Sequence, residues 1–189
     1  MLKAMSNMEN DKVIFLREVN IDDANLIAQW YNNKENIKFM STIIRCKNHS
    51  KKEIEKELRN LDPNYERLFM ICLKGKEQPI GHAGIDDIDF EDLRGEIFFL
   101  IGNQEEQSKG YGFKVAMCLL DYAFNKLKLN SLFASASVEN VSSQKVLLKS
   151  GFKVIGIRRE YNNFKGKFSD EIFYDLTKSD YFKQKLILN

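Results

Sequence analysis

The segment from Phe98 to Phe113 has the residue types and spacing most suited to chemistry in this sequence. It reads as an apolar strand, a short polar loop with Gly110 and Gly112, and a helix that begins at once. Closely spaced glycines let the backbone approach a ligand, and the unpaired N–H groups of a helix start favour an anion. Lys109 adds a positive charge beside them. The segment therefore predicts a site for a phosphate or pyrophosphate group.

Two common nucleotide-binding motifs do not fit this loop. The Walker sequence GxxxxGK followed by Ser or Thr does not occur, and Val115 stands where GxGxxG requires its third glycine. The absence of both motifs disfavours a nucleotide-dependent enzyme. A glycine pair before a helix is also compatible with an ordinary turn, so the loop alone leaves the function open.

Four blocks of the sequence resemble the GCN5-related N-acetyltransferases, the GNAT superfamily. Gln107–Gly112 (QSKGYG) is similar to that family's Q/R-x-x-G-x-G/A loop for the acyl-CoA pyrophosphate. Asn140–Phe152 (NVSSQKVLLKSGF) resembles the N-x-x-S/A…K-x-G-F helix beside the coenzyme, and Glu96–Gly102 (EIFFLIG) resembles the strand that separates to admit the pantetheine arm. Gly156–Tyr174 is similar to the branch with ribosomal-protein N-terminal and spermidine acetyltransferases. Together the blocks cover roughly residues 12–178 in the expected order.

This resemblance implies an α/β protein, with a mixed, mostly antiparallel twisted sheet flanked by helices. It also implies direct transfer of the acetyl group of acetyl-CoA, as cosubstrate, to a primary amine in a ternary complex. The acceptor would be a protein N-terminus, a polyamine or another small amine. The alternative is a non-catalytic acyl-CoA-binding sensor or interaction module of the same fold. The implied coenzyme contacts are Leu100, Ile101, Gly102, Gln107, Ser108, Lys109, Gly110, Tyr111, Gly112, Asn140 and Ser143.

Direct transfer needs a base for the amine and benefits from an acid for the leaving thiolate. Glu96 is the candidate base because it begins the separating strand, although a Glu in that position is often merely solvated. Many family members place a tyrosine acid where this chain has Leu147, so the resemblance shifts that role to Ser143. Ser143 could equally be a local hydrogen bonder in its helix. Asn140 could be only a helix N-cap, a role compatible with coenzyme contact.

The sequence says less about the acceptor site. Asp86 to Asp92 places five carboxylates in seven residues, which is either a solvated hairpin or an attractor for a cationic amine. The resemblance places the acceptor pocket near the first helices, although the aromatic residues there could simply be core. The expected acceptor-site residues are Trp30, Tyr31, Phe39, Asp86 and Glu96.

The elements that must position these residues follow from periodicity and capping signals. Three strands with short connections in the middle of the chain predict an antiparallel meander. Residues 33–49 read as irregular, and Tyr174 on the last strand reads as core. The expected strands are 12–18, 68–73, 80–88, 96–101, 132–138, 152–160 and 171–176. The first expected helix ends at Asn32, and three further helices are expected over 50–61, 110–127 and 141–149.

Composition is typical of a folded globular protein. The 189 residues carry 29 Lys and Arg against 27 Asp and Glu, a net charge of +2, with 43% hydrophobic and 30% charged residues. We expect a flexible tail over residues 1–11 and one domain over 12–189. A pI of about 8.3 with interspersed charges disfavours nucleic-acid binding.

Cysteine and histidine are too sparse for a metal centre. Cys46, Cys72 and Cys118 are isolated, and His49 and His82 are the only histidines, so we expect no metal. The first ten residues lack the apolar stretch of a signal peptide, and no membrane partner is expected. The expected location is cytoplasmic, and a homodimer is an expectation by analogy with the family branch.

Overall fold

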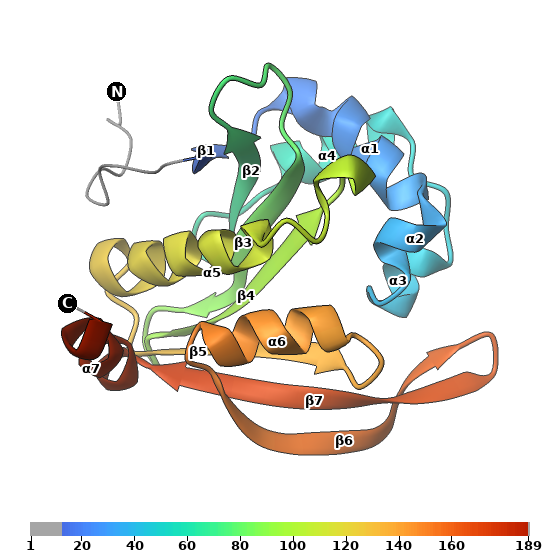
Figure 1. Ribbon diagram of the computed structural model, residues 1–189. Coiled ribbons are helices and arrows are strands. Elements are labelled where there is room, and N and C mark those ends of the chain that lie inside the picture. Colours follow the sequence, from blue (N-terminus) through green and yellow to red (C-terminus); the bar gives the residue numbers. More distant parts are fainter. Residues whose placement is uncertain (1–12, 189) are drawn as a thin grey trace.

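The computed structural model describes residues 13–188, which are built around a seven-stranded sheet (Figure 1). Neighbouring strands are antiparallel except for β4 and β5, which run parallel. This confirms the mixed, mostly antiparallel sheet, while the predicted tail over 1–11 lies outside the described residues. The sheet order is β1 (Ile14–Glu18), β2 (Arg67–Leu73), β3 (Gly81–Asp89), β4 (Arg94–Ile101), β5 (Ser131–Ser137), β7 (Lys167–Thr177) and β6 (Lys153–Phe164).

Helices cover both faces of the sheet. Figure 1 shows α5 and α6 side by side across one face, while α1 and α4 pack against the opposite face of β2. Within residues 13–188, no helix is long and apolar enough to cross a membrane. The helices are α1 (Ala24–Asn32), α2 (Lys34–Ile37), α3 (Thr42–Arg45), α4 (Lys51–Arg59), α5 (Tyr111–Asp121), α6 (Val141–Lys149) and α7 (Lys178–Leu188), with short turns η1 (Ile21–Asp23), η2 (Gln104–Glu106) and the π-helical η3 (Tyr122–Lys126).

Side-chain caps fix where the helices near the site begin. Ser50 and Glu53 form the predicted capping box: the Glu53 N–H donates to Ser50 Oγ at 3.2 Å, and the Ser50 N–H donates to Glu53 Oε2 at 2.8 Å. Asn140 Oδ1 accepts from the Ser143 N–H at 3.2 Å and starts α6. Gly151 ends α6 at φ +97°, a conformation that favours glycine.

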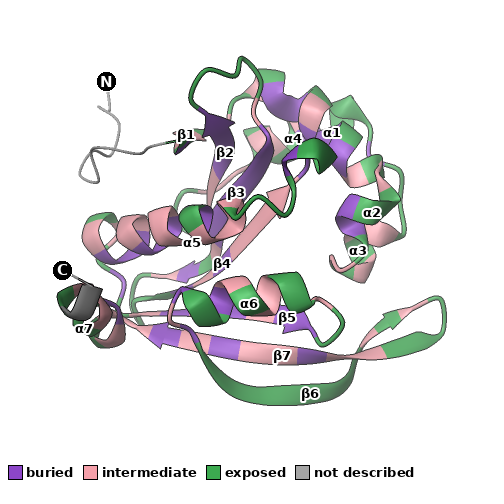
Figure 2. Cartoon of the chain, in the orientation of Figure 1, coloured by how far each residue is buried: buried purple, intermediate pink, exposed green. Residues whose placement is uncertain are grey.

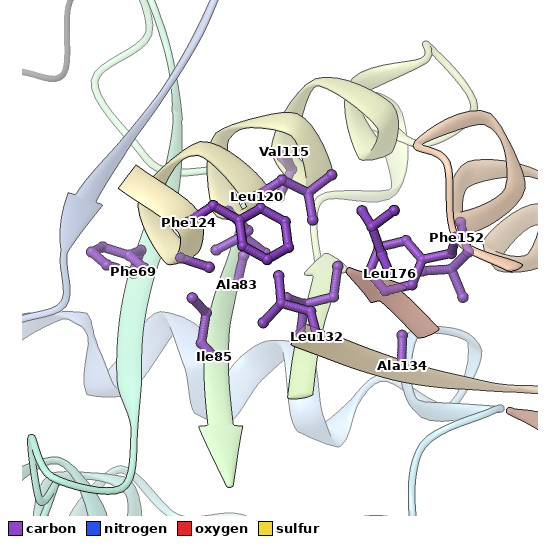
Figure 3. Close-up of a cluster of buried hydrophobic side chains, with 14 of the residues drawn as sticks. Phe69, Ala83, Ile85, Val115, Leu120, Phe124, Leu132, Ala134, Phe152 and Leu176 are labelled. Carbon is purple, nitrogen blue, oxygen red and sulfur yellow. The ribbon is translucent and has the colours of Figure 1, made fainter. Parts of the chain in front are cut away.

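The main core lies between the sheet and the α5–α6 layer (Figure 3). Ala83 and Ile85 from β3 meet Val115 and Leu120 from α5, and Tyr174 is buried here as predicted. Figure 2 shows the buried positions concentrated along the inner strands, whereas β6 is largely exposed. A second cluster forms on the opposite face, where α1 and α4 cover alternate residues of β2. The two faces of β2 to β4 therefore belong to different layers.

Four features differ from the sequence-based expectations. Residues 33–49 contain the single-turn helices α2 and α3, and the Asn33 side chain caps α2 by accepting from the Glu35 N–H. The helix expected over 110–127 changes to π-helical geometry at Tyr122. The last two strands extend further, to a hairpin tip at Gly166, and α7 was not expected.

Candidate active site

The sheet opens between β4 and β5. These strands pair only through Arg94–Ser131, Gly95–Leu132 and Glu96–Phe133. β4 continues to Ile101 and β5 to Ser137, with no further pairing between them among residues 13–188. The facing backbone groups therefore lack a strand partner, as expected of a strand that separates to admit an extended ligand. Glu96 occupies the point where the separation starts.

The loop after β4 has the backbone geometry of an anion site. Ser108 and Gly110 both have left-handed φ angles, +60° and +80°, and α5 begins directly after them. Residues of opposite handedness in succession turn their N–H groups toward one side and form a nest for an anion. Gly112 instead allows the start of α5 to pack closely against Phe99 and Val146, because an added Cβ would lie 3.2 Å from Phe99 and 3.3 Å from Val146. The two glycines thus have separate roles.

The charge expected from Lys109 is partly neutralised. Its Nζ lies 3.0 Å from Glu106 Oε2, and the same buried carboxylate accepts a hydrogen bond from Lys76. Hydrogen bonds from these two lysines hold the pKa of Glu106 below its ordinary value. Two ammonium groups and one carboxylate leave a net single positive charge at the loop. Lys109 thus contributes to this positive charge as expected, and its contact with the coenzyme stays a prediction.

A carboxyl pair lies on the face of β3 and β4 opposite the main core. Asp86 and Glu96 are directly opposite each other in the ladder. Burial, and then the charge of Asp86, raises the pKa of Glu96 to about 7, although Ser135 Oγ donates a hydrogen bond to it at 3.4 Å. Burial raises the pKa of Asp86 to about 6. Asp86 Oδ1 is buried without a hydrogen-bond partner in the described structure. Such a pair can bind an ammonium group and accept its proton.

The run of carboxylates from Asp86 to Asp92 divides into two parts. A bulge separates Asp86 from Asp89, with Asp87 at φ +49°. Beyond the bulge, Arg94 lies 3.3 Å from Asp89 and 3.6 Å from Asp92 in an exposed hairpin. The hairpin interpretation is therefore right for the later residues. Asp86 is the member of the run that faces Glu96.

A pocket of about 580 Å³ lies beside this carboxyl pair, between α1, α4 and β2. Tyr31 lines it, and burial followed by the charges of Glu57 and Asp86 raises the pKa of that phenol, which keeps it protonated. The sequence interpretation named Tyr31 but not the rest of this lining, in which three glutamates stand beside two lysines. The lining residues are Ile27, Tyr31, Lys47, Glu53, Ile54, Lys56, Glu57, Leu58, Asn60, Leu61, Glu66, Leu68 and Phe98.

The other two aromatic candidates do not line this pocket. Trp30 is buried in the α1–β2 cluster, and its ring covers Gly102 at the end of β4. Phe39 is half-buried beyond α2, with the Lys38 ammonium 5.0 Å from its ring centre. The structure therefore gives Trp30 a packing role and leaves Tyr31 as the aromatic candidate at the pocket.

His82 is buried against two aromatic residues of the pocket lining, Tyr31 and Phe98. Its ring is 1% exposed and stacks among Trp30, Tyr31 and Phe98, with centroid distances of 6.3, 5.3 and 6.0 Å. Neither ring nitrogen has a hydrogen-bond partner in the described structure, and burial lowers the pKa of His82 to about 4. The imidazole is therefore neutral near pH 7 and acts as an aromatic packing residue.

The far side of the strand opening is formed by β5 and the start of α6. Asn140 caps α6, and Ser143 is half-buried in its first turn. The N-cap role of Asn140 is confirmed, while its coenzyme contact and the acid role of Ser143 stay predictions. Leu100 and Ile101 point their side chains into opposite hydrophobic clusters, so only their backbone groups are left for the opening.

Comparison with known proteins decides the family. Residues 14–153 match the family model for the acetyltransferase (GNAT) domain. The chain belongs to this GNAT family. It is 28% identical over 167 residues to the uncharacterized N-acetyltransferase p20 of Bacillus licheniformis, with 88% of this chain and 93% of that protein covered. It is also 28% identical to the probable N-acetyltransferase YjcK of Bacillus subtilis (strain 168), over 86% and 93%.

The solved structures agree in fold with this GNAT chain. The crystal structure of spermidine N-acetyltransferase from Vibrio cholerae, in complex with CoA and spermine, superposes with a TM-score of 0.81 at 23% identity. The match covers 91% of this chain and 99% of that one. Family membership and the named relatives identify the protein as an N-acetyltransferase. Within residues 13–188, no group of three or more His, Cys, Asp or Glu side chains is arranged to hold a metal.

Proposed function

We propose that the protein transfers the acetyl group of acetyl-CoA to a primary amine of a polyamine or similar small cation. The observation that carries this proposal is the half-buried Asp86–Glu96 pair at the start of the strand opening. A buried carboxylate pair is costly unless a cation joins it. An ammonium-bearing acceptor would supply that cation at the place where the thioester is expected to lie.

Further carboxylates continue the pair across the sheet. In the antiparallel pairing of β2 with β3, Leu68 lies opposite Gly84. Backbone pairing extends beyond β2, because the Ile88 N–H donates a hydrogen bond to Tyr65 O at 2.9 Å. This register places Glu66 beside Asp86, whose pKa its charge helps to raise. Since adjacent strands lie about 4.8 Å apart, Glu66, Asp86 and Glu96 form a row.

A row of carboxylates suits a chain that carries several ammonium groups. Glu66 and Glu57 line the adjoining pocket, and the rings of Tyr31 and Phe98 offer faces that attract cations. The spacing from strand to strand resembles that of nitrogens separated by three or four carbons. The Vibrio cholerae enzyme of similar fold was crystallised with spermine, which supports the same acceptor class for this chain.

The proposed reaction is a direct transfer in a ternary complex. Glu96, with a pKa of about 7, accepts a proton from the acceptor ammonium. The free amine then attacks the thioester carbonyl and the C–N bond forms. As the C–S bond breaks and the thiolate leaves, the nitrogen gives up its second proton to Ser143 Oγ, whose own hydroxyl proton goes to the thiolate sulfur. Backbone N–H groups near Leu100 to Gly102 would stabilise the oxyanion, and Ser143 would protonate the thiolate. The Gln107–Gly112 loop would hold the pyrophosphate.

Thiol release from acetyl-CoA tests this function across a panel of amines. The panel contains spermidine, spermine, aminoglycosides, amino sugars and short peptides with free N-termini. We expect the highest kcat/KM with the polyamines. A peptide as the best acceptor would replace the polyamine assignment with protein N-terminal acetylation. Coenzyme binding without turnover of any amine would support the sensor alternative.

We also propose that the protein self-associates through the outer edge of β6. Val154, Ile155 and Ile157 are each more than half exposed on this edge strand. Exposed apolar edges are rare in monomers because they invite pairing. A related spermidine N-acetyltransferase from Vibrio cholerae is dodecameric. Light scattering should show an oligomer that Ile155→Lys converts to a smaller species, and a monomeric wild type would overturn the proposal.

A further inference from the structure

We propose that Asn36 is a positioning residue that sets the conformation of the coenzyme loop from the acceptor side of the molecule. The proposal rests on the function above, because it takes residues 107–112 as the coenzyme loop. Asn36 belongs to α2, which follows α1 directly, and α1 carries Tyr31 of the acceptor-side pocket. The residue lies far from the loop in sequence and drew no attention in the sequence analysis.

The Asn36 amide makes hydrogen bonds in two directions. Its side chain is only 8% exposed. Asn36 Nδ2 donates to Gly102 O at 2.8 Å, and Asn36 Oδ1 accepts from Gln107 Nε2 at 3.0 Å. Gln107 Nε2 also donates to Ile101 O at 2.8 Å. One buried amide thus joins the end of β4 to the first residue of the QSKGYG loop.

These hydrogen bonds involve two backbone carbonyl groups at the end of β4. The carbonyls of Ile101 and Gly102 are both occupied by side-chain amide donors. These two bonds therefore hold the orientation of the Ile101 and Gly102 peptide groups, which lead into the loop. Asn36 must both donate and accept, and a carboxylate in its place would repel the carbonyl of Gly102.

A close packing contact reinforces the connection. A Cβ on Gly102 would come within 2.2 Å of the Trp30 ring, so α1 is seated directly on the end of β4. Gln104 Nε2 also lies 3.4 Å from Asn33 Oδ1, a second and weaker link between the same segments. The α1–α2 segment and the loop after β4 therefore hold each other in place.

Calorimetric titration with acetyl-CoA tests this role without depending on the acceptor. We expect Asn36→Asp and Gln107→Met each to raise the Kd for acetyl-CoA about tenfold. Because both residues act through one chain of hydrogen bonds, the double variant should bind about as weakly as either single variant. A hundredfold loss in the double variant would mean independent effects and would overturn the proposal. Unchanged affinity in both single variants would also overturn it.

A kinetic measurement separates positioning from a general loss of stability. Positioning predicts a higher KM for acetyl-CoA with kcat changed less than threefold, whereas partial unfolding lowers kcat and leaves KM unchanged. The matched control is Asn32→Ala, which removes two hydrogen bonds to the His49 backbone but does not reach the loop. We expect this control to unfold at a lower temperature and to bind acetyl-CoA normally. Equal effects of Asn32→Ala and Asn36→Asp on KM would refute the inference.

Further variants keep the test decisive. Gln107 has an exposed side chain, so Gln107→Met can carry the affinity measurement if Asn36→Asp fails to fold. Gly112→Glu separates the two levels of the argument. If Gly112→Glu binds acetyl-CoA normally, the loop assignment in the proposed function is wrong. If Gly112→Glu loses binding while Asn36 and Gln107 variants bind normally, only the positioning role is wrong.

Discussion

The proposed coenzyme loop and the proposed acceptor face suit ligands of opposite charge, and they are built from different parts of the chain. The loop after β4 presents backbone N–H groups, left-handed residues and lysines whose charge Glu106 partly balances. The proposed acceptor face presents Asp86 and Glu96 from the neighbouring strands β3 and β4, whose pKa values are raised by burial. In the proposed function an anion would thus be held mainly by local backbone geometry, whereas a cation would be held by side chains that only the sheet brings together.

This difference has consequences for mutation. Backbone donors cannot be deleted by a side-chain change, so the loop is sensitive to bulk and added charge. Carboxylates can be neutralised one at a time without changing shape, so the acceptor face is sensitive to Asp→Asn and Glu→Gln changes. Each variant below should therefore affect one ligand and spare the other.

The largest effect is expected from Glu96→Gln. Loss of the base should lower kcat about a hundredfold to a thousandfold, within the usual range for general base catalysis. The Kd for acetyl-CoA, measured by calorimetry, should stay unchanged because the loop is untouched. Glu96→Asp, which keeps a carboxylate, should recover part of the rate. Full turnover by the Gln variant would assign the base to another residue.

Gly112→Glu should raise the Kd for acetyl-CoA at least a hundredfold. The new side chain would crowd Phe99 and Val146 and would place a negative charge beside the pyrophosphate. Gly112→Ala adds bulk without charge and should weaken binding by about tenfold, so the two variants separate the two causes. A thermal melt confirms that each variant folds. Affinity equal to the wild type would remove the loop from the coenzyme site.

Asp86→Asn should raise the KM for spermidine about tenfold or more. A hydrogen bond to a charged group contributes about 1.5–3 kcal/mol, and each 1.4 kcal/mol corresponds to a factor of ten. The KM for acetyl-CoA should not change. Glu91→Gln is the matched control because Glu91 is an exposed carboxylate in the same acidic run. If both variants raise the KM equally, the run acts only as a diffuse field.

Ser143→Ala should lower kcat by about threefold to tenfold. The effect is smaller than that of losing the base because a thiolate is already a good leaving group near neutral pH. The α6 cap should survive, since it uses the Ser143 backbone N–H. Ser142→Ala, at the exposed neighbouring position, is the control. No change in kcat would restrict Ser143 to local hydrogen bonding.

The smallest effect is a shift in the pH profile. Glu96 must be ionised to act as base, so kcat/KM should rise with pH through about 7. Asp86 raises the pKa of Glu96 by its negative charge, so Asp86→Asn should move this limb toward acid. Using one amine for both proteins cancels the titration of the substrate itself. A limb that does not move would show that the two carboxyls are not coupled.

The local backbone structure around the proposed coenzyme loop could be predicted from the sequence for a physical reason. Its loop and the two helix starts are continuous stretches, and the glycines, the Asn140 cap and the capping box at Ser50 act over only a few residues. The strand opening was expected from the family resemblance of Glu96–Gly102 rather than from a local pattern, and the β4–β5 pairing ends at Glu96. The coenzyme contacts themselves stay predictions.

The acceptor side could be predicted only in part. Asp86 was singled out, but its separation from Asp89 depends on a bulge that no residue type announces. Glu57 and Glu66 precede Asp86 by 20 residues or more. Trp30, expected at the acceptor site, lies in the α1–β2 cluster, since core and pocket aromatics look alike in sequence. Asn36 became visible only through its partners across the fold. Contacts between distant segments leave no contiguous signal.

The neutral His82 bears on how stability responds to acid. Its folded pKa of about 4 lies below the ordinary 6.5, so the unfolded chain binds the proton more readily and stability falls as pH drops from 6.5 toward 4. Asp86 and Glu96 have raised pKa values, so the folded chain holds their protons more tightly and stability falls as pH rises through the same range. The two slopes oppose each other. The carboxyl pair of the proposed acceptor site thus lies near a buried imidazole whose contribution to the pH dependence of folding opposes that of the pair.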